Sequence, residues 1–378
     1  MPSLMNVEVR TRLEHDGKLR LSLETSPVTT PGADEIVVRI DAAPLNPSDQ
    51  ILLLGPVDPA SLRESGSGER PLIEGNVPHE RLPGLAARLG KSLGVGNEGA
   101  GTVVATGSNT GEYAGRLVAL RSTTGTFARY QVVRAEDCIV LPEGATARDG
   151  ASAFINPLTA LGMVETMRRE GHKALVHTAA ASNLGQMLNR LCLADGIPLV
   201  NIVRSAEQAA MLRAQGAVHV LDSHADDFPA ALVDALAATG ATLAFDAIGG
   251  GTMAGRILAA METVALRSVE GYSRYGSRVH KQVYVYGVLD AGPRILEGQF
   301  GTAWSVSGWL MTWFCETLAP ADISRLRARV ASELTTTFAS AYSAEVGLAE
   351  LLTIDAIKGF TRKATGTKFL VLPQKELP

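Results

Sequence analysis

The segment 174–185 holds the residues best placed for chemistry, because an apolar stretch is followed there by a turn of small residues and an amphipathic stretch. The dinucleotide-binding pattern GxGxxG uses glycine to make a tight turn, to let the backbone approach a pyrophosphate and to pack helix against strand. Ala180, Ser182 and Gly185 occupy its three positions here, so only the packing glycine is retained. The N–H groups and dipole of a helix beginning near Asn183 would attract a diphosphate. A phosphate-binding turn is therefore predicted, with a purely structural strand-to-helix turn as the alternative.

Arg204 follows the next apolar stretch, 19 residues beyond Gly185. In an NAD site an acidic residue near this position accepts the ribose 2′-hydroxyl, whereas a guanidinium offers forked donors to the 2′-phosphate of NADPH. The sequence therefore predicts NADPH as the cofactor, unless Arg204 is only an exposed residue at a strand end. Two later apolar stretches also end near glycines, and ligands of open α/β sheets bind at the carboxyl ends of strands. The predicted cofactor contacts in this part of the chain are Ala180, Ala181, Ser182, Asn183, Leu184, Gly185, Arg204, Ser205, Ile248, Gly249, Tyr286, Gly287 and Val288.

Short apolar stretches alternate with helical patterns after Pro157. This alternation is typical of βαβ units, so a doubly wound parallel sheet of the Rossmann type is predicted, in a chain of the α/β class. The predicted strands are 174–178, 199–204, 218–221, 242–246 and 283–287, and the predicted helices are 184–194, 206–215, 228–238 and 253–266.

The N-terminal part has a different pattern. Short β-branched runs at 36–40, 101–105 and 116–120 lie between Gly, Pro, Asn and Asp residues, which predicts an antiparallel, β-rich region. The stretch 55–94 is rich in Pro and Gly and has little periodicity, so we expect a long surface excursion that is either a lid or a solvated insertion. A helix-like stretch at 346–358 and a strand-like stretch at 368–372 follow, and the latter is expected to return to the first domain.

The composition is that of an ordinary globular chain, with 378 residues, 46% of them apolar, and 35 Lys and Arg against 39 Asp and Glu. The length suggests two domains, and the mild acidity argues against nucleic acid as the main partner. The three cysteines Cys138, Cys192 and Cys315 are too widely spaced for a clustered metal site, and a reducing, cytoplasmic setting fits them best. The sequence shows neither an apolar run suited to a membrane helix nor a signal-peptide core, so a small-molecule partner is expected.

Seven motifs along the chain carry a resemblance to a known family: Asn46-Pro-Ser-Asp49, Gly96-Asn-Glu-Gly-Ala-Gly101, Gly115-Arg-Leu-Val118, Gly125-Thr-Phe-Ala-Arg-Tyr130, Asn156-Pro-Leu-Thr-Ala160, the segment 174–185 and Thr365-Gly-Thr-Lys368. Their order and spacing resemble the medium-chain dehydrogenase/reductase superfamily, specifically its zinc-independent quinone oxidoreductase and enoyl-thioester reductase branch. The resemblance implies a GroES-like, β-rich catalytic domain formed by 1–155 and 331–378. It also implies a Rossmann NADP-binding domain at 156–330, an active site in the cleft and a homodimer.

The resemblance also bears on metal binding. Zinc alcohol dehydrogenases of this superfamily hold the catalytic metal with a Cys, a His and a Cys, in positions that this chain fills with Asn46, Asn97 and Asn156. Neutral amides are poor ligands for Zn²⁺, so a site without metal is expected. In the zinc-free branch, Asn46 and Thr159 orient the nicotinamide end of the cofactor against the substrate, and we expect Asn156 to contact the cofactor as well.

The proton donor stays unassigned by the resemblance. Enoyl-thioester reductases carry a catalytic tyrosine shortly after the Asn-Pro-Ser-Asp motif, where this chain reads Leu54-Gly-Pro-Val57. Quinones can take their protons from solvent after hydride addition, so the missing tyrosine is compatible with quinone reduction. The candidate replacements are Tyr272, Tyr275 and Lys281 in the insert 268–282, and His79, but a solvated loop residue is the favoured interpretation of each.

All three tryptophans lie close together, at Trp304, Trp309 and Trp313. If this segment is helical, Trp309, Leu310, Trp313 and Phe314 share one face, which favours a core or subunit-interface role over substrate stacking or a membrane-surface helix.

Together these features predict a zinc-independent, NADPH-dependent oxidoreductase that transfers hydride to a quinone or an α,β-unsaturated carbonyl compound. One alternative is a catalytically silent NADPH-binding protein with a sensor or structural role, and another is an enoyl-thioester reductase. A metal-dependent alcohol dehydrogenase is a further alternative, which the three asparagines oppose.

Overall fold

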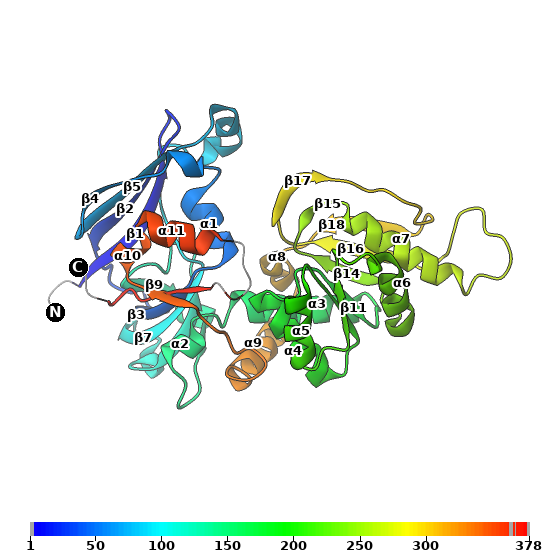
Figure 1. Ribbon diagram of the computed structural model, residues 1–378. Helices are drawn as coiled ribbons and strands as arrows, with labels where there is room; N and C mark the ends of the chain where they lie inside the picture. Colours follow the sequence, from blue (N-terminus) through cyan, green and yellow to red (C-terminus); the bar gives the residue numbers. More distant parts are fainter. Residues whose placement is uncertain (1–3, 363–365, 367, 376–378) are drawn as a thin grey trace. The chain divides into compact units, whose positions relative to one another are not determined.

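The computed structural model describes residues 4–362, 366 and 368–375. The chain divides into two compact units, Met1–Ile155 with Arg327–Pro378, and Asn156–Leu326 (Figure 1). Thr365 and Thr367 of the last family motif lie outside the described residues. In the described part of the chain, no helix combines the length and the apolar character needed to cross a membrane.

The first unit is built on two sheets, whose neighbouring strands are antiparallel except for the parallel pair β19 and β20. One sheet has the order β4 (Arg63–Ser67), β5 (Arg70–Asn76), β2 (Lys18–Pro27), β1 (Met5–Leu13) and β6 (Ser92–Gly94). The other has the order β10 (Cys138–Val140), β8 (Leu117–Arg121), β7 (Glu98–Thr106), β3 (Glu35–Pro44), β20 (Phe369–Val371) and β19 (Ala344–Val346), with β9 (Tyr130–Arg134) also paired to β3. The antiparallel β-rich region is therefore confirmed, and β20 brings the end of the chain back to it, as predicted.

Short helices connect these strands. They are α1 (Pro47–Leu54), α2 (Ala147–Gly150), α10 (Leu348–Leu351) and α11 (Ile354–Thr361), with the 3-10 helices η1 (Pro59–Ser61), η2 (His79–Arg88), η3 (Gly111–Tyr113) and η4 (Ala135–Asp137). A single helix over 346–358 was wrong, because Val346 ends β19 and the rest forms α10 and α11. The N-cap of α11 is Thr353, whose hydroxyl accepts a hydrogen bond from the N–H of Ala356 and so starts a new helix within the stretch.

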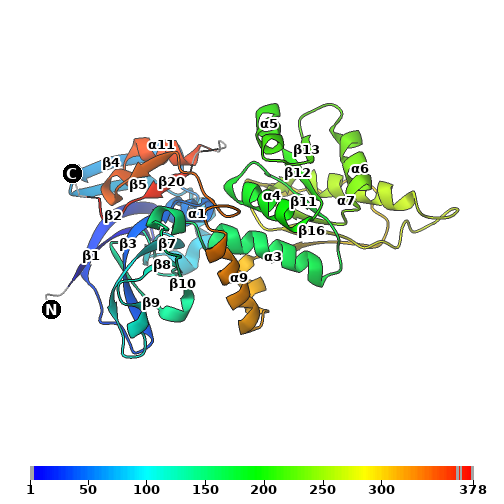
Figure 2. The same ribbon diagram turned by 90° about the horizontal axis from the view of Figure 1, so that it is seen from below.

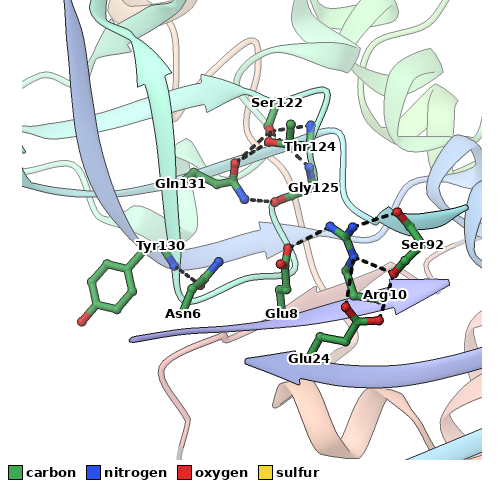
Figure 3. Close-up of polar contacts among 10 residues, drawn as sticks. All are labelled: Asn6, Glu8, Arg10, Glu24, Ser92, Ser122, Thr124, Gly125, Tyr130 and Gln131. Atoms are coloured by element: carbon green, nitrogen blue, oxygen red, sulfur yellow. Dashed lines mark hydrogen bonds and ion pairs between the residues drawn. The ribbon is translucent and has the colours of Figure 1, made fainter. Parts of the chain in front are cut away.

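The stretch 55–94 is not the irregular excursion that we expected. β5 pairs with β2 over five residues and β6 pairs with β1, so both belong to the five-stranded sheet. Arg10 fixes β6 to that sheet, because its guanidinium donates to the hydroxyl of Ser92 over 3.1 Å and to the carbonyl of Ser92 over 2.8 Å, while Glu8 and Glu24 balance its charge (Figure 3). Part of the segment therefore belongs to the sheet and its core, whereas β4 is exposed at all five positions and η2 buries only Leu82.

The second unit contains a six-stranded parallel sheet of order β13 (His219–Asp222), β12 (Leu199–Val203), β11 (Leu175–His177), β14 (Leu243–Asp246), β16 (Lys281–Val285) and β18 (Trp304–Gly308). Numbered along the chain, this is the Rossmann order 3-2-1-4-5-6, in which the direction of winding reverses between β11 and β14. The predicted doubly wound sheet is confirmed. Because ligands bind at the carboxyl ends of strands at such a switch point, the fold directs attention to the turns after β11, β14 and β16.

The connections of this unit are α3 (Ile155–Arg169), α4 (Asn183–Asp195), α5 (Ala206–Ala214), α6 (Phe228–Thr239), α7 (Met253–Leu266), α8 (Met311–Glu316) and α9 (Pro320–Ser332), which continues into the first unit. A small parallel pair, β15 (Gly249–Gly251) and β17 (Asp290–Arg294), lies outside the main sheet. In Figure 2, α4 and α5 lie beside β11, β12 and β13. Phe228, Leu232, Ile257 and Met261 of α6 and α7 are buried with strand residues such as Val176 in one hydrophobic cluster.

The tryptophans do not share a helical face, so that prediction was wrong. Trp304 lies in β18 and Trp309 precedes α8, which begins only at Met311. Trp309 packs edge-on against Phe245 with ring centres 5.4 Å apart, whereas Trp313 is 68% exposed. Trp304 packs edge-on against Phe300, with ring centres 5.1 Å apart, and against the hydrophobic cluster of the parallel sheet, so the predicted core role applies to Trp304 and Trp309 but not to Trp313.

Candidate functional site

The turn between β11 and α4 brings together the predicted phosphate-contacting residues. Ala179 adopts a left-handed backbone with φ 51°, and no other non-glycine residue in the described ranges does so. Ser182 caps α4, and its hydroxyl accepts a hydrogen bond from the N–H of Gly185 over 3.1 Å. A Cβ on Gly185 would lie 2.2 Å from the carbonyl oxygen of Ala180, so only glycine permits this packing of helix against turn.

The carboxyl ends of β11 and β14 are joined by a buried carboxylate that the sequence analysis did not single out. The Oδ1 atom of Asp246 accepts hydrogen bonds from the Thr178 hydroxyl over 2.7 Å and from the N–H of Ile248 over 2.9 Å. Its Oδ2 atom accepts one from the N–H of Gly249 over 3.2 Å. The Thr178 hydroxyl in turn accepts from the N–H of Ala247. Asp246 therefore fixes the two turns at the same edge of the sheet.

The turn after β16 closes against the turn after β14. A Cβ on Gly249, whose φ is +79°, would lie 2.6 Å from the carbonyl oxygen of Gly287, and one on Gly287 would lie 2.5 Å from that of Ala247. Two of the predicted glycines are thus required by close backbone approach. Val288 follows and is 54% exposed. The structure therefore brings Ile248, Gly249 and Gly287 together.

His177 ends β11 and contacts Tyr286 directly after β16. The imidazole is fully buried, and its Nε2 atom lies 2.7 Å from the Tyr286 hydroxyl. The two rings stack at an angle of 19° with centres 5.8 Å apart. Burial lowers the pKa of His177 to about 3, so the ring is neutral, and burial raises the pKa of Tyr286, an effect that the nearby Asp246 carboxylate reinforces. Sequence reasoning missed His177, although a lone histidine in a buried apolar strand was a visible signal.

Arg204 lies exposed at the end of β12. Its N–H donates to Gln208 Oε1 over 3.0 Å, and Ser205 caps α5 by accepting from the N–H of Gln208. The imidazole Nδ1 of His224 lies 2.9 Å from the Arg204 carbonyl oxygen, so this side chain contacts the backbone at the predicted 2′-phosphate position. The sequence analysis did not connect His224 with Arg204.

In the first unit, Asn46 is 3% exposed and precedes α1 as its N-cap. Its amide Nδ2 donates to Oε1 of Glu98 over 2.8 Å, and Oε2 of Glu98 accepts from the N–H groups of Phe154 and Ile155 over 2.9 and 2.8 Å. Burial raises the pKa of the Glu98 carboxyl, and the Lys368 ammonium opposes the rise. The hydrogen bond to Glu98 therefore fixes the orientation of the Asn46 amide, with its NH₂ group toward Glu98.

Asp49 is a second fully buried carboxyl next to Asn46. It accepts hydrogen bonds from the N–H of Asn46 over 2.7 Å and from the N–H of Asn97 over 2.9 Å. Burial raises the pKa of Asp49 to about 7, although the Asn46 N–H opposes this, and Glu98 adds to the rise. These contacts hold α1 and the Gly96–Gly101 motif against each other.

Lys368 carries positive charge toward this pair of carboxyl groups. Burial lowers the pKa of Lys368 to about 8, and Glu98 and Asp49 oppose that shift. Its ammonium donates to the Ser152 hydroxyl over 2.7 Å, and the Ser152 and Tyr342 hydroxyl oxygens are 2.8 Å apart. Sequence reasoning named Lys368 only as a motif residue and did not identify this chain of contacts.

The other predicted residues are distributed between the two units. Asn156 and Thr159 lie in the first turns of α3, and Thr159 is 7% exposed. The Asn97 amide, at the second of the three positions where zinc enzymes carry ligands, donates to the Ser48 hydroxyl over 2.9 Å. The described ranges contain no group of three or more His, Cys, Asp or Glu side chains that could hold a metal ion.

Lys281 was a wrong candidate for the proton donor. It is fully buried, and its ammonium lies 2.5 Å from Glu262 Oε2 and 3.1 Å from the Ser277 hydroxyl. A buried ammonium with these partners serves to hold the insert to α7 and β16. Tyr272 and Tyr275 are 92% and 65% exposed, and His79 is exposed in η2, as solvated residues would be.

Comparison with known proteins adds independent information on the family. The chain is 28% identical over 142 residues to a quinone oxidoreductase of Pseudomonas aeruginosa, covering 37% of this chain and 44% of that protein. It is 28% identical over 197 residues to the mitochondrial enoyl-[acyl-carrier-protein] reductase of Bos taurus, covering 50% and 45%. A mycobacterial protein solved in complex with NADPH has the same fold, with a TM-score of 0.68 and 20% identity, covering 97% of this chain and all of that one. The predicted resemblance to the medium-chain dehydrogenase/reductase superfamily is confirmed.

The similarity to this superfamily has a defined extent. No protein-family model matches the chain. The matches span about half the length of the curated relatives or somewhat less. The fold agrees with that of the mycobacterial structure over nearly the whole chain, so the similarity in fold includes both the β-rich unit and the Rossmann unit.

Proposed function

We propose that the protein is a zinc-independent, NADPH-dependent oxidoreductase that reduces a quinone or an α,β-unsaturated carbonyl compound. The observation that carries the proposal is the edge of the parallel sheet where Asp246 and three glycines hold the turns after β11, β14 and β16 together. The relatives named as a quinone oxidoreductase and an enoyl reductase, and the similar structure solved with NADPH, support it.

The residues at this edge fit a dinucleotide. The Ala179–Ser182 turn carries only small side chains, and the 13-residue helix α4 begins directly after it, so its N-terminal dipole can meet a diphosphate. Arg204 and Ser205 follow the neighbouring strand, where a guanidinium can pair with a 2′-phosphate. Ile248, Gly249, Tyr286, Gly287 and Val288 would line the remainder of the dinucleotide site.

The bound dihydronicotinamide would supply the hydride, which is the chemistry the cofactor contributes. The protein's own part is to bind and orient. Asn46 and Thr159, each buried in its own unit, are the residues proposed to hold the nicotinamide end, and Asn156 is proposed to contact the cofactor as well. Glu98 keeps the Asn46 amide in one orientation. The entropic cost of ordering this side chain on cofactor binding is therefore smaller.

The stereochemistry of NADPH oxidation tests the proposal. NADPH should be consumed with quinones or conjugated enones, and NADPH deuterated at one C4 face should show a primary isotope effect when hydride transfer limits the rate. The other face should show none, because a firmly held ring presents only one face to the acceptor. An effect from both faces, or oxidation of simple saturated alcohols, would overturn the proposal.

An acceptor panel separates this function from its alternatives. An enoyl-thioester reductase is the second candidate, because the chain is similar to mitochondrial enoyl-[acyl-carrier-protein] reductases. Its proton-donating tyrosine has no counterpart after α1, which ends at Leu54. Faster turnover of crotonyl thioesters than of quinones would favour that candidate. NADPH binding without turnover of any acceptor would favour a silent NADPH-binding protein.

The setting is proposed to be cytoplasmic, with the protein as a homodimer. Cys138, Cys192 and Cys315 are all free thiols, which is usual in a reducing compartment. Mass measurement in solution tests the homodimer, and fractionation of the source cells tests the location.

A further inference from the structure

The contact between His177 and Tyr286 leaves one buried ring nitrogen without a partner. His177 Nε2 lies 2.7 Å from the Tyr286 hydroxyl, but its Nδ1 atom is buried and has no hydrogen-bond partner in the described part of the chain. Buried polar atoms are almost always paired, so such an exception needs a physical explanation. The pair lies at the carboxyl ends of β11 and β16, directly beside the proposed dinucleotide site.

The unpartnered atom indicates where the ring hydrogen is. Burial keeps the imidazole neutral, so it carries one N–H donor and one acceptor nitrogen. With the hydrogen on Nδ1, a buried donor would be left unpaired in the protein. With the hydrogen on Nε2, the ring donates to the Tyr286 oxygen, leaves Nδ1 as an unprotonated acceptor and frees the Tyr286 hydrogen for an acceptor outside the protein. An orphaned buried N–H donor is then avoided, which is the rarer defect in folded proteins. The Nε2–H tautomer is therefore the favoured one when an acceptor outside the protein takes the Tyr286 hydrogen.

This tautomer determines the direction of the Tyr286 hydroxyl. An oxygen that accepts from His177 must send its own hydrogen elsewhere. Asp246 is the charged group that acts on Tyr286, but the hydrogen bonds that its carboxylate accepts in the described part of the chain come from Thr178, Ile248 and Gly249, and none joins it to the Tyr286 hydroxyl. The structure shows no other partner for this hydroxyl within the described ranges.

We propose that Tyr286 donates its hydroxyl hydrogen bond to a carbonyl oxygen of the ligand bound at this sheet edge, and that His177 is the positioning residue that turns the hydroxyl toward it. The inference rests on the proposed function, which supplies two such oxygens, the nicotinamide carboxamide and the carbonyl of the reducible acceptor. No proton is transferred in this role. The hydroxyl orients or polarises the carbonyl.

The tautomer is measured without any ligand. Long-range ¹⁵N–¹H correlation spectra of protein labelled with ¹⁵N-histidine distinguish Nε2–H from Nδ1–H, and His177→Gln identifies the signal among the seven histidines. We expect Nε2–H for His177. An Nδ1–H ring would overturn the inference, because Tyr286 would then donate to the imidazole and have no hydrogen for a ligand.

The ligand contact is tested with Tyr286→Phe and a control on the same strand, Tyr284→Phe. Tyr284 donates its hydroxyl to Glu170 over 2.6 Å, so the control removes a tyrosine hydroxyl that is already paired within the protein. The probes are NADP⁺ and 2′,5′-ADP, which lacks the nicotinamide riboside half. For Tyr286→Phe we expect about a tenfold loss in NADP⁺ affinity or in kcat/KM, which is the scale of one neutral hydrogen bond.

Which of the two measurements changes identifies the carbonyl that Tyr286 contacts. Weaker NADP⁺ binding with unchanged 2′,5′-ADP binding assigns the carboxamide, whereas unchanged NADP⁺ binding with lower kcat/KM assigns the acceptor carbonyl. If Tyr286→Phe matches wild type in both measurements and its thermal unfolding is also unchanged, the inference is wrong while the proposed function stands. If wild type binds neither NADP⁺ nor 2′,5′-ADP, the proposed function fails first.

Discussion

Acid should destabilise the Asn156–Leu326 unit through His177. In the native protein burial holds the pKa of this imidazole at about 3, whereas an ordinary histidine titrates near 6.5. Below pH 6.5 the unfolded chain therefore binds a proton that the native chain does not bind. The contribution of His177 to stability is fully present above pH 6.5 and is lost as the pH falls toward 3.

The size of the effect follows from the shift. One pKa unit corresponds to about 1.36 kcal/mol, so His177 alone should lower the free energy of unfolding by roughly 3 kcal/mol between pH 7 and pH 4. The side chain is 0% exposed and its Nδ1 is unpartnered within the described ranges, so neither solvent nor a nearby acceptor offsets this cost.

Tryptophan fluorescence is a suitable assay, because Trp304, Trp309 and Trp313 all belong to the same unit as His177. Urea unfolding is followed from pH 7 to pH 4 for wild type and for His177→Phe, which keeps an aromatic ring against Tyr286 but cannot be protonated. The wild type should lose about 3 kcal/mol more than the variant over this range. His224→Phe, which removes an exposed histidine, is the matched control. Parallel pH profiles for wild type and His177→Phe would refute the reasoning.

Three further predictions concern the cofactor, the insert and the metal. Arg204→Ala should reduce the preference for NADPH over NADH by about ten- to a hundredfold and leave NADH binding nearly unchanged, because only the 2′-phosphate contact is lost. Titration of both cofactors measures this preference, and equal affinities in wild type would contradict the prediction. Lys281→Met should lower the free energy of unfolding by about 3–5 kcal/mol because it leaves Glu262 buried without its cation, whereas the double variant with Glu262→Gln should lose less in the same denaturation experiment. Dialysis against a chelator should leave turnover unchanged, since Asn46, Asn97 and Asn156 are neutral amides; zinc that is lost together with activity would show that the site has been misplaced.

The parallel sheet was predictable because both of its signals are local. Each buried strand is a short apolar run, and each crossover has helical periodicity with residues such as Ser205 at its start. The predicted helix 253–266 agrees with α7 at both ends, and the other boundaries differ by a residue or two. The turn residues follow from the same pattern, since a strand that ends before a helix fixes where the carboxyl edge lies.

The stretch 55–94 was misread because its alternation is carried by unusual residues. In β5 the buried positions are Pro71, Ile73 and Gly75, followed by Val77 just beyond the strand. Proline and glycine count as turn signals in a sequence, so they concealed a period of two. Position 75 requires glycine because a Cβ there would lie 2.7 Å from the Val57 side chain, a contact that depends on how the chain folds back.

The buried carboxyl groups show a further reason why the site could not be read in full. Asp49, Glu98 and Asp246 are each completely buried, whereas Asp and Glu are exposed in most proteins and would be expected at the surface from sequence alone. All three are compensated mainly by backbone N–H groups, and those that bond Glu98 come from Phe154 and Ile155, more than fifty residues away. Because every residue except proline carries an N–H group, no side-chain pattern marks such a partner. The sequence could therefore single out Asn46 as a candidate, but the orientation of its amide follows only from a tertiary contact, in which Glu98 accepts a hydrogen bond from Nδ2 and leaves Oδ1 on the opposite side of the amide.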